Sequence, residues 1–276
     1  MSKAVSGKAH GALAGLALGL ASLGLGGCGS SSDDDKNYVE RPVEVLYNRA
    51  LDDLGAQEYK AAAKGFEEVD RQHPYSVWAT KAQIMAAFAY YQSNKYDEAI
   101  IALDRFIQLH PGHRDIPYAY YLKALCFYEQ ISDVGRDQRV TQQALDALAE
   151  VVKRFPESPY ARDARLKVEL AIDHLAGKEM AVGRYYQSNQ QYVGAINRYR
   201  VVIERYQTTT HVPEALHRLV ESYLSLGVKQ EAKEAAAVLG YNFPGSEWYQ
   251  DSYYLMTGEG TPAPSDEKRG WFFGLF

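Results

Sequence analysis

Cysteine and histidine are the residues of this chain best suited to chemistry, and their spacing can be compared with that of known sites. The sequence contains two cysteines and seven histidines. His110 and His113 stand three apart in Leu-His-Pro-Gly-His, but no third ligand is near them in sequence, so a prolyl turn explains them better than a metal ion. The chain also lacks His-Glu-x-x-His, Gly-x-Ser-x-Gly, Walker and dinucleotide-binding patterns. We therefore predict that the chain is not an enzyme and holds no metal or small-molecule cofactor.

The two cysteines lie in different settings. Cys126 falls inside an apolar pattern with helical spacing, which predicts a buried thiol without a disulfide. Cys28 follows Gly26 and Gly27 near the N-terminus and has no suitable disulfide partner. Another role is therefore needed for Cys28.

The segment before Cys28 has the features of an export signal. Lys3 and Lys8 precede an uncharged apolar run from Ala12 to Leu25. This run is shorter than the about 20 apolar residues that a membrane-spanning helix needs, and it fits the apolar part of a secretion signal. Its end, Leu-Gly-Gly-Cys, resembles the signal of bacterial lipoproteins. An ordinary signal peptide with a cysteine nearby is the alternative.

The lipoprotein resemblance implies a covalent lipid anchor. Residues 1–27 would be the signal peptide, and Cys28 would carry a diacylglycerol and an N-acyl chain, which together give stable anchoring. Residues 28–41 would then be the acylated cysteine and a flexible tether rich in Gly, Ser and Asp. Gly29, rather than aspartate, follows Cys28, and by the same resemblance this favours the outer membrane.

A repeated helical unit must position the other residues of interest. Its clearest copy runs from Tyr96 to Pro111, where Ala99, Leu103 and Phe106 recur at helical spacing and His-Pro ends the helix. An alanine stands twelve residues before the proline. Alanines at this position are Ala62, Ala99, Ala144 and Ala232, and Ala195 stands twelve residues before Gln207.

Other positions keep the same phase in each copy. Eight residues past each stop a second small residue opens the next helix, at Ala82, Ala119, Ala164, Ala215 and Ser252. Small residues at fixed phase are what stacked helical hairpins need where two helices pass closely. The first two copies are 37 residues apart, near the 34 residues of a tetratricopeptide (TPR) repeat. We therefore predict an all-α superhelical array of about five TPR-like helix-turn-helix hairpins, which is an α-solenoid.

The copies also divide the chain into segments. Residues 42–156 would hold hairpins one to three, and residues 157–257 an extra helix and hairpins four and five. The extra helix is expected at 159–176, closed near Gly177. Residues 258–276 are expected to be a disordered tail.

The tail ends in the aromatic sequence Trp271–Phe276. It is interpreted either as a loosely packed terminus or as a docking peptide or second membrane contact.

Tyrosine is abundant, with 22 copies in the chain. Aromatic residues at helical spacing usually belong to the core. In a TPR array, however, the first helix of each hairpin lines a concave groove, and a groove of tyrosines can hold an extended peptide. The alternative is that the extra helix or the N-terminal segment fills the groove. The expected groove residues are Tyr47, Lys81, Ile84, Phe88, Tyr91, Tyr118, Tyr121 and Tyr128.

The charge of the chain argues against nucleic acid as a partner. Its formal net charge is −5, and removal of Lys3 and Lys8 with the signal makes it −7. Binding to phosphates requires a basic face.

The signal and the repeats together resemble the BamD (ComL-like) family of outer membrane protein assembly lipoproteins. The resemblance covers roughly residues 38–250 and rests on Asp-Arg-Phe-Ile-x-Leu-x-Pro at 104–111, the long insertion, and Val182–Arg198. It implies a lipid-anchored scaffold on the periplasmic face of the outer membrane. The implied partners are a BamA-type β-barrel insertase, accessory Bam lipoproteins and C-terminal segments of unfolded outer membrane proteins. It also implies that Arg198 lies in the half that faces the insertase.

Two other functions remain open at this point. A TPR lipoprotein that coordinates cell-wall synthesis with envelope constriction would carry similar repeats. An enzyme that uses the array as a specificity module would need a catalytic domain, and the hairpins leave no segment for one.

Overall fold

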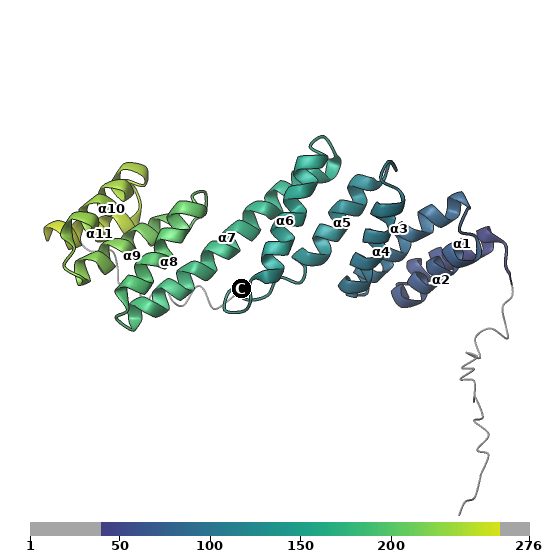
Figure 1. Cartoon of the computed structure of the whole chain (residues 1–276), viewed down its shortest axis with the longest axis horizontal. Helices are drawn as coiled ribbons and strands as arrows, with labels where there is room; N and C mark the ends of the chain where they lie inside the picture. The colour runs from purple at the N-terminus through teal and green to yellow at the C-terminus, as the bar shows by residue number, and fades with distance from the viewer. Residues whose placement is uncertain (1–39, 260–276) are drawn as a thin grey trace, which may run out of the picture. The chain divides into compact units, whose positions relative to one another are not determined.

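The computed structural model describes residues 40–259, and every regular element in this range is an α-helix (Figure 1). The predicted all-α array of helical hairpins is confirmed. The eleven helices are α1 (Val43–Gly55), α2 (Tyr59–Gln72), α3 (Val77–Gln92), α4 (Tyr96–Leu109), α5 (Ile116–Tyr128), α6 (Arg139–Arg154), α7 (Pro159–Ser188), α8 (Tyr192–Arg205), α9 (Val212–Ser225), α10 (Lys229–Asn242) and α11 (Glu247–Thr257).

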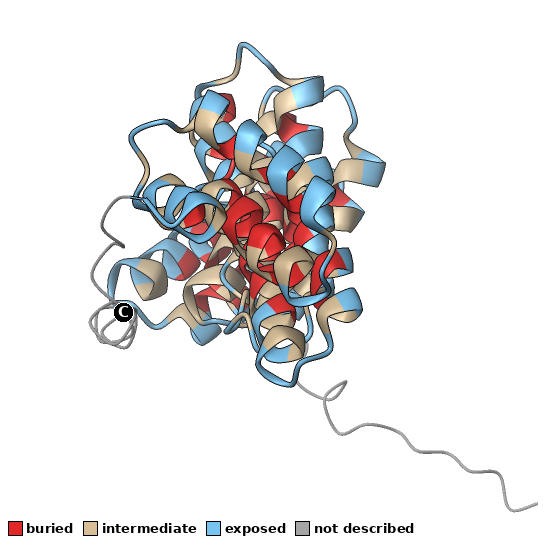
Figure 2. Ribbon diagram, turned by 90° about the vertical axis from the view of Figure 1, so that its left-hand side faces the viewer, coloured by how far each residue is buried: buried red, intermediate tan, exposed pale blue. Residues whose placement is uncertain are grey.

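The helices pack in chain order. Each helix contacts the next one, and α1, α3, α5 and α7 also contact one another in sequence. The odd-numbered helices therefore form one layer and the even-numbered helices the other. Figure 2 shows the buried residues gathered between the helices and the exposed residues at the periphery.

Small residues allow the close approach of the two layers. The predicted register is confirmed, because each of its small residues has essentially no exposed surface. The residues four and seven positions after the alanines, such as Leu103 and Phe106, are also buried, and only Ala236 is half-buried. These fully buried small residues are Ala62, Ala82, Ala99, Ala119, Ala144, Ala164, Ala195, Ala215, Ala232 and Ser252.

The turns inside the hairpins share one backbone device. A residue with positive φ stands two positions before the start of α2, α4, α8 and α10. The sequence YYQSN occurs at 90–94 and 185–189, at the ends of α3 and α7. The residue with positive φ is Asn94 (φ 58°), the last letter of the first copy, and Gln190 (φ 60°), the residue after the second copy. Both turns have three residues, 93–95 and 189–191, but α3 ends at Gln92 whereas α7 ends one letter further along the repeated sequence, at Ser188. This difference shifts the repeated letters by one position against the alanine register.

The long helix α7 corrects one expectation. The predicted helix end near Gly177 is wrong, because α7 runs without a break for 30 residues from Pro159 to Ser188. Gly177 is buried, and a Cβ atom there would lie 3.3 Å from Nε2 of His211 and 3.6 Å from Cγ1 of Val134. The glycine thus serves close packing in mid-helix. The extra helix and the first helix of hairpin four are one element.

Several expectations fall outside the described residues. They concern the signal peptide, Cys28, most of the tether, and the tail from residue 260 with Trp271–Phe276. The last helix ends at Thr257, where Gly258 adopts the left-handed conformation (φ 72°) typical of a helix C-terminus. Across residues 40–259, no helix combines the length and apolar composition needed to cross a bilayer.

Candidate functional site: an aromatic face on α3, α5 and α7

Two of the expected groove residues belong to the core. Tyr47 and Ile84 are buried, and the ring centre of Tyr47 lies 5.4 Å from that of Phe66 and 4.8 Å from that of Trp78. Tyr47 on α1 thus packs against side chains of α2 and α3, and Ile84 is buried on α3. Neither side chain offers an open surface to a ligand. Lys81 is exposed, and its Nζ lies 5.2 Å from the centre of the Trp78 ring.

The remaining expected residues are half-buried on α3 and α5. Phe88 and Tyr91 come from α3, and Tyr118, Tyr121 and Tyr128 come from α5. The spacing of the three α5 tyrosines, three and then seven residues apart, places them on one side of the helix. Contact between α3 and α5 brings the two sets together.

Helix α7 completes this surface with residues that the sequence analysis missed. Tyr160, Asp163, Lys167, Leu170 and His174 recur at intervals of three and four and so share one side of α7. This stripe lies within the helix expected at 159–176, but the sequence analysis placed no binding surface on that helix. The helical spacing from Tyr160 to His174 was the signal in the sequence that could have revealed it.

Aromatic rings from α5 and α7 pack against each other. The Tyr121 and Tyr160 rings are stacked with centres 5.1 Å apart, and the Tyr118 and Tyr160 ring centres are 5.4 Å apart. We call the surface formed by Tyr91, Tyr118, Tyr121, Tyr128, Tyr160 and Leu170 the aromatic face.

A hydrogen bond fixes the orientation of Tyr121 in the aromatic face. The Tyr121 hydroxyl donates to Asp163, whose carboxylate also accepts from Lys167 Nζ. Burial, followed by the nearby Asp163, raises the pKa of Tyr121, while the Tyr121 hydrogen bond and Lys167 lower the pKa of Asp163. Burial also raises the pKa of Tyr118 to about 12. Tyr118 and Tyr121 are therefore neutral at physiological pH.

A pocket of about 450 Å³ adjoins the aromatic face between α5 and α7. Tyr128, Glu129, Leu170, Asp173 and His174 line it together with Ile131. Leu170 is 58% exposed, and the Nε2 atom of His174 is buried without a hydrogen-bond partner among residues 40–259. The pocket can accept an apolar side chain, and the carboxylates of Glu129 and Asp173 can accept hydrogen bonds from backbone or side-chain donors.

Arg198 has a partner within the chain. Its Nη1 lies 3.2 Å from Oε2 of Glu179, and this ion pair joins α8 to α7. The Arg198 side chain is 44% exposed. A docking partner could therefore approach the guanidinium, although it would have to share it with Glu179.

A polar network among α7, α9 and α11 was not predicted from the sequence. Glu221 accepts hydrogen bonds from Gln187 (2.8 Å) and Arg218 (2.9 Å), and it lies 3.4 Å from His217 Nε2. His217 is buried, and its Nδ1 lies 2.8 Å from the hydroxyl of buried Ser252. The network ties the last helix to the array.

Glu221 is expected to make the C-terminal hairpins sensitive to acid. Burial alone would raise the pKa of Glu221, but its hydrogen bond with His217 and the charge of Arg218 outweigh burial and lower the pKa from 4.5 to about 2. A lowered carboxyl pKa stabilises the fold above the unfolded pKa, and this stabilisation is lost as the pH falls from 4.5 towards 2. We expect Glu221→Gln to lower the free energy of unfolding by about 2 kcal/mol at neutral pH and far less near pH 2. Urea unfolding followed by circular dichroism at both pH values measures this, and an equal loss at both would contradict it.

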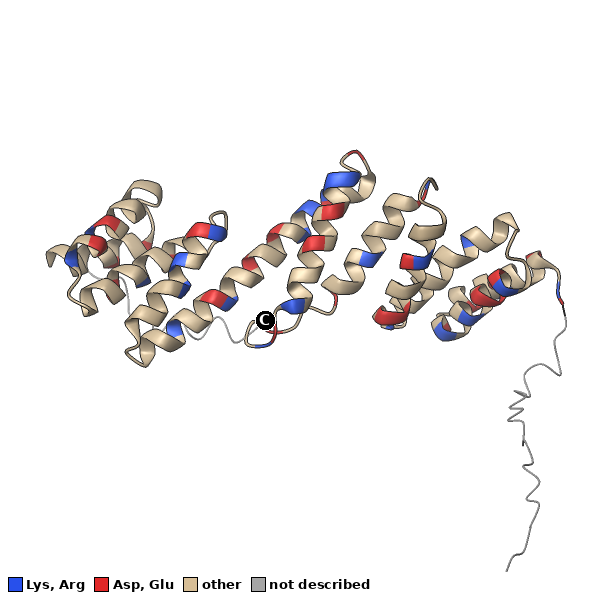
Figure 3. Cartoon of the chain, in the orientation of Figure 1, with Lys and Arg blue, Asp and Glu red and all other residues tan. Residues whose placement is uncertain are grey.

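The remaining chemistry-bearing residues have structural roles. His110 Nε2 lies 3.0 Å from Gln83 Oε1, and the rings of His110 and His113 pack on Phe106. Cys126 is a buried thiol, as predicted, and burial raises its pKa to about 12. Within the part that the structure describes, no group of three or more His, Cys, Asp or Glu side chains could hold a metal ion. Figure 3 shows Lys and Arg interspersed with Asp and Glu along the helices in this view.

The fold defines a helical-repeat protein of the α-solenoid class. Residues 39–239 match the family model YfiO, described as outer membrane lipoprotein. The chain therefore belongs to the YfiO family, which confirms the resemblance drawn from the repeats.

Curated relatives carry the name outer membrane protein assembly factor BamD. The chain is 51% identical over 253 residues to that of Caulobacter vibrioides, which covers 91% of this chain and 83% of the relative. It is 46% identical over 234 residues to that of Rickettsia prowazekii (85% and 92%) and 36% identical over 237 residues to that of Neisseria meningitidis (81% and 89%). All three are named as assembly factors, which agrees with the prediction that the chain is not an enzyme.

Proposed function

We propose that the chain is a lipid-anchored scaffold subunit of the machinery that assembles β-barrel proteins in the outer membrane. Its identity of 51% to the BamD assembly factor of Caulobacter vibrioides, over 91% of the chain, carries this proposal. The anchor would be the acylated Cys28, and the helical array would lie on the periplasmic face. No observation favours the alternative role in coordinating cell-wall synthesis.

The aromatic face would receive C-terminal segments of unfolded barrel proteins. An extended segment presents apolar side chains together with backbone donors and acceptors. Tyrosine side chains can bind both kinds of group, because each ring buries apolar area while its hydroxyl forms hydrogen bonds. The adjoining pocket, with exposed Leu170 on one side, would accept an apolar side chain of such a segment.

The C-terminal hairpins would dock the BamA-type insertase and accessory Bam lipoproteins. Arg198 supports this role because its guanidinium is partly exposed and its bond to Glu179 is a surface ion pair, which costs little to rearrange. Anchoring at the membrane would raise the local concentration of the scaffold near an insertase in the same bilayer.

Leu170→Asp is expected to weaken binding of a barrel segment about tenfold, since it removes an apolar contact and adds a third carboxylate to the pocket, an effect of about 1.4 kcal/mol. The probe is a fluorescein-labelled peptide from the last residues of a porin, titrated with the purified chain and followed by anisotropy.

Leu109→Asp is the matched control. Leu109 is 56% exposed, close to the 58% of Leu170, but it ends α4 and does not line the pocket. Unchanged affinity in both variants, or an equal loss in both, would contradict binding at the aromatic face.

A further inference from the structure

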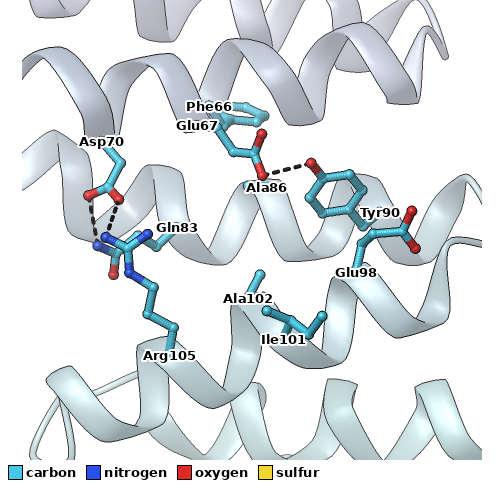
Figure 4. A pocket seen from close by; sticks show the side chains of 10 residues that line it. All are labelled: Phe66, Glu67, Asp70, Gln83, Ala86, Tyr90, Glu98, Ile101, Ala102 and Arg105. Carbon is cyan, nitrogen blue, oxygen red and sulfur yellow. Dashed lines mark hydrogen bonds and ion pairs between the residues drawn. The ribbon is translucent and has the colours of Figure 1, made fainter. Parts of the chain in front are cut away.

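A second pocket, of about 220 Å³, lies between α2, α3 and α4, and none of its lining residues belongs to the aromatic face (Figure 4). Short side chains create it. Ala86 on α3 and Ala102 on α4 leave a space between α2 and α4, with Phe66 at one side. Ile101 stands at this pocket and is 69% exposed. The pocket therefore has apolar walls that are open to solvent.

The polar lining of this pocket is predominantly acidic. Three carboxylates, those of Glu67, Asp70 and Glu98, face a single guanidinium, that of Arg105. Arg105 lies 3.2 Å from Asp70, which also accepts a 2.8 Å hydrogen bond from Gln83 (Figure 4).

Glu67 differs from the other two carboxylates. Glu98 pairs with Lys95 at 3.1 Å, whereas Glu67 accepts a 2.7 Å hydrogen bond from the Tyr90 hydroxyl and forms no ion pair within residues 40–259. Figure 4 shows the Glu67 carboxylate and the Tyr90 hydroxyl on the side of the pocket opposite the Asp70–Arg105 pair. One carboxylate beside an aromatic ring and apolar walls is thus left without a cation.

We propose that this pocket binds the basic side chain, lysine or arginine, of a partner polypeptide. The aliphatic stem would lie along Ile101, Ala102 and Ala86, and the cationic end would reach Glu67 and the Tyr90 ring. Size supports a single side chain, because pockets for drug-sized ligands are typically about 300–1,000 Å³. The chain itself shows that the rim attracts a cation, since Lys95 Nζ lies 5.8 Å from the centre of the Tyr90 ring.

The first experiment is an NMR titration of the full chain, in detergent, with Nα-acetyl-lysine N-methylamide. Methyl signals of Ile101, Ala86 and Ala102 report on the pocket. We expect a saturable shift of these signals, and binding about fivefold weaker for the uncharged norleucine analogue, the size of a favourable surface ion pair. Glu67→Gln should weaken lysine binding by a similar factor and leave norleucine binding unchanged. The Gln side chain can still accept from Tyr90, so the fold is retained.

Asp97→Asn is the matched control, because Asp97 is an exposed carboxylate in the first turn of α4 that does not line the pocket. It should bind the lysine probe like the wild type. Equal binding of the lysine and norleucine probes, no effect of Glu67→Gln, or no saturable shift would each overturn the proposal.

A second experiment tests whether a polypeptide supplies the cation. A photo-crosslinking residue at position 101 of the full chain in its native membrane should form adducts whose mapped peptides contain a lysine or arginine beside the cross-link. These adducts should decrease in the Glu67→Gln background. Adducts on segments without a basic residue, or an adduct yield that is unchanged by Glu67→Gln, would contradict the proposal.

Discussion

Replacing Tyr199 with alanine is expected to lower the free energy of unfolding of the C-terminal hairpins by about 3–5 kcal/mol. Tyr199 is among the largest fully buried side chains, and its hydroxyl donates to Gln187 at 2.7 Å. Its ring fills the space over Gly183, where even a Cβ atom would lie 2.4 Å from a ring carbon. Truncation therefore leaves a cavity between α7 and α8 that the glycine cannot fill.

Hydrogen exchange measured by mass spectrometry can locate this loss. In a repeat array each hairpin depends mainly on its neighbours, so protection should fall in α7 to α9 and stay unchanged in α2 and α3. Tyr199→Phe should cost only about 1 kcal/mol, for the lost hydrogen bond. Tyr185→Ala is the control at an exposed site, since Tyr185 is 66% exposed. Equal losses for Tyr199→Ala and Tyr185→Ala would contradict the packing described here.

Replacing Cys28 with alanine is expected to abolish acylation and release the chain from the membrane. Several acyl chains on one cysteine contribute about 0.8 kcal/mol for each buried methylene, which makes the attachment effectively permanent. Intact-mass spectrometry should show the added lipid on the wild type and its absence from the variant. After an alkaline carbonate wash, the variant should be in the supernatant.

Cys126→Ala is the matched cysteine control. Cys126 is buried in α5 and should not be acylated, so this variant should keep both the lipid mass and the membrane attachment. Membrane retention of Cys28→Ala after the wash, with no partner holding it, would contradict the lipid anchor.

The repeat was the most predictable part of the fold. Ala99 stands in helical phase with Leu103 and Phe106 and at a fixed spacing from Pro111, so the pattern predicts both the helix and its buried side. The structure buries every small residue of that register. The course of α7 was less predictable, because glycine can either end a helix or permit close packing. Contacts with His211 and Val134, both distant in sequence, decide this at Gly177.

The functional surface was predictable only in part. Helical phase placed Tyr118, Tyr121 and Tyr128 on one side of α5, but it could not separate them from Tyr47, which meets Phe66 and Trp78 in the core. Whether a tyrosine is buried depends on the side chains that the neighbouring helices place beside it. The network around Glu221 has the same origin. His217 and Arg218 stand at helical spacing from Glu221 on α9, but Gln187 and Ser252 come from helices distant in sequence.

The position of an affinity tag matters for the decisive measurement. The loop before α6 is a poor site, because the Gly135 carbonyl accepts from Lys178 and Val134 packs near Gly177. Gly112, in the turn between α4 and α5, is exposed and has no neighbour near its Cβ position. An insertion there should leave the helices intact.

The most direct test of the assembly function is to capture the tagged chain from membranes dissolved in mild detergent and to identify its partners by mass spectrometry. We predict a stoichiometric, large β-barrel protein with periplasmic domains. Recovery of peptidoglycan synthases or constriction proteins, without such a barrel, would contradict the proposed function.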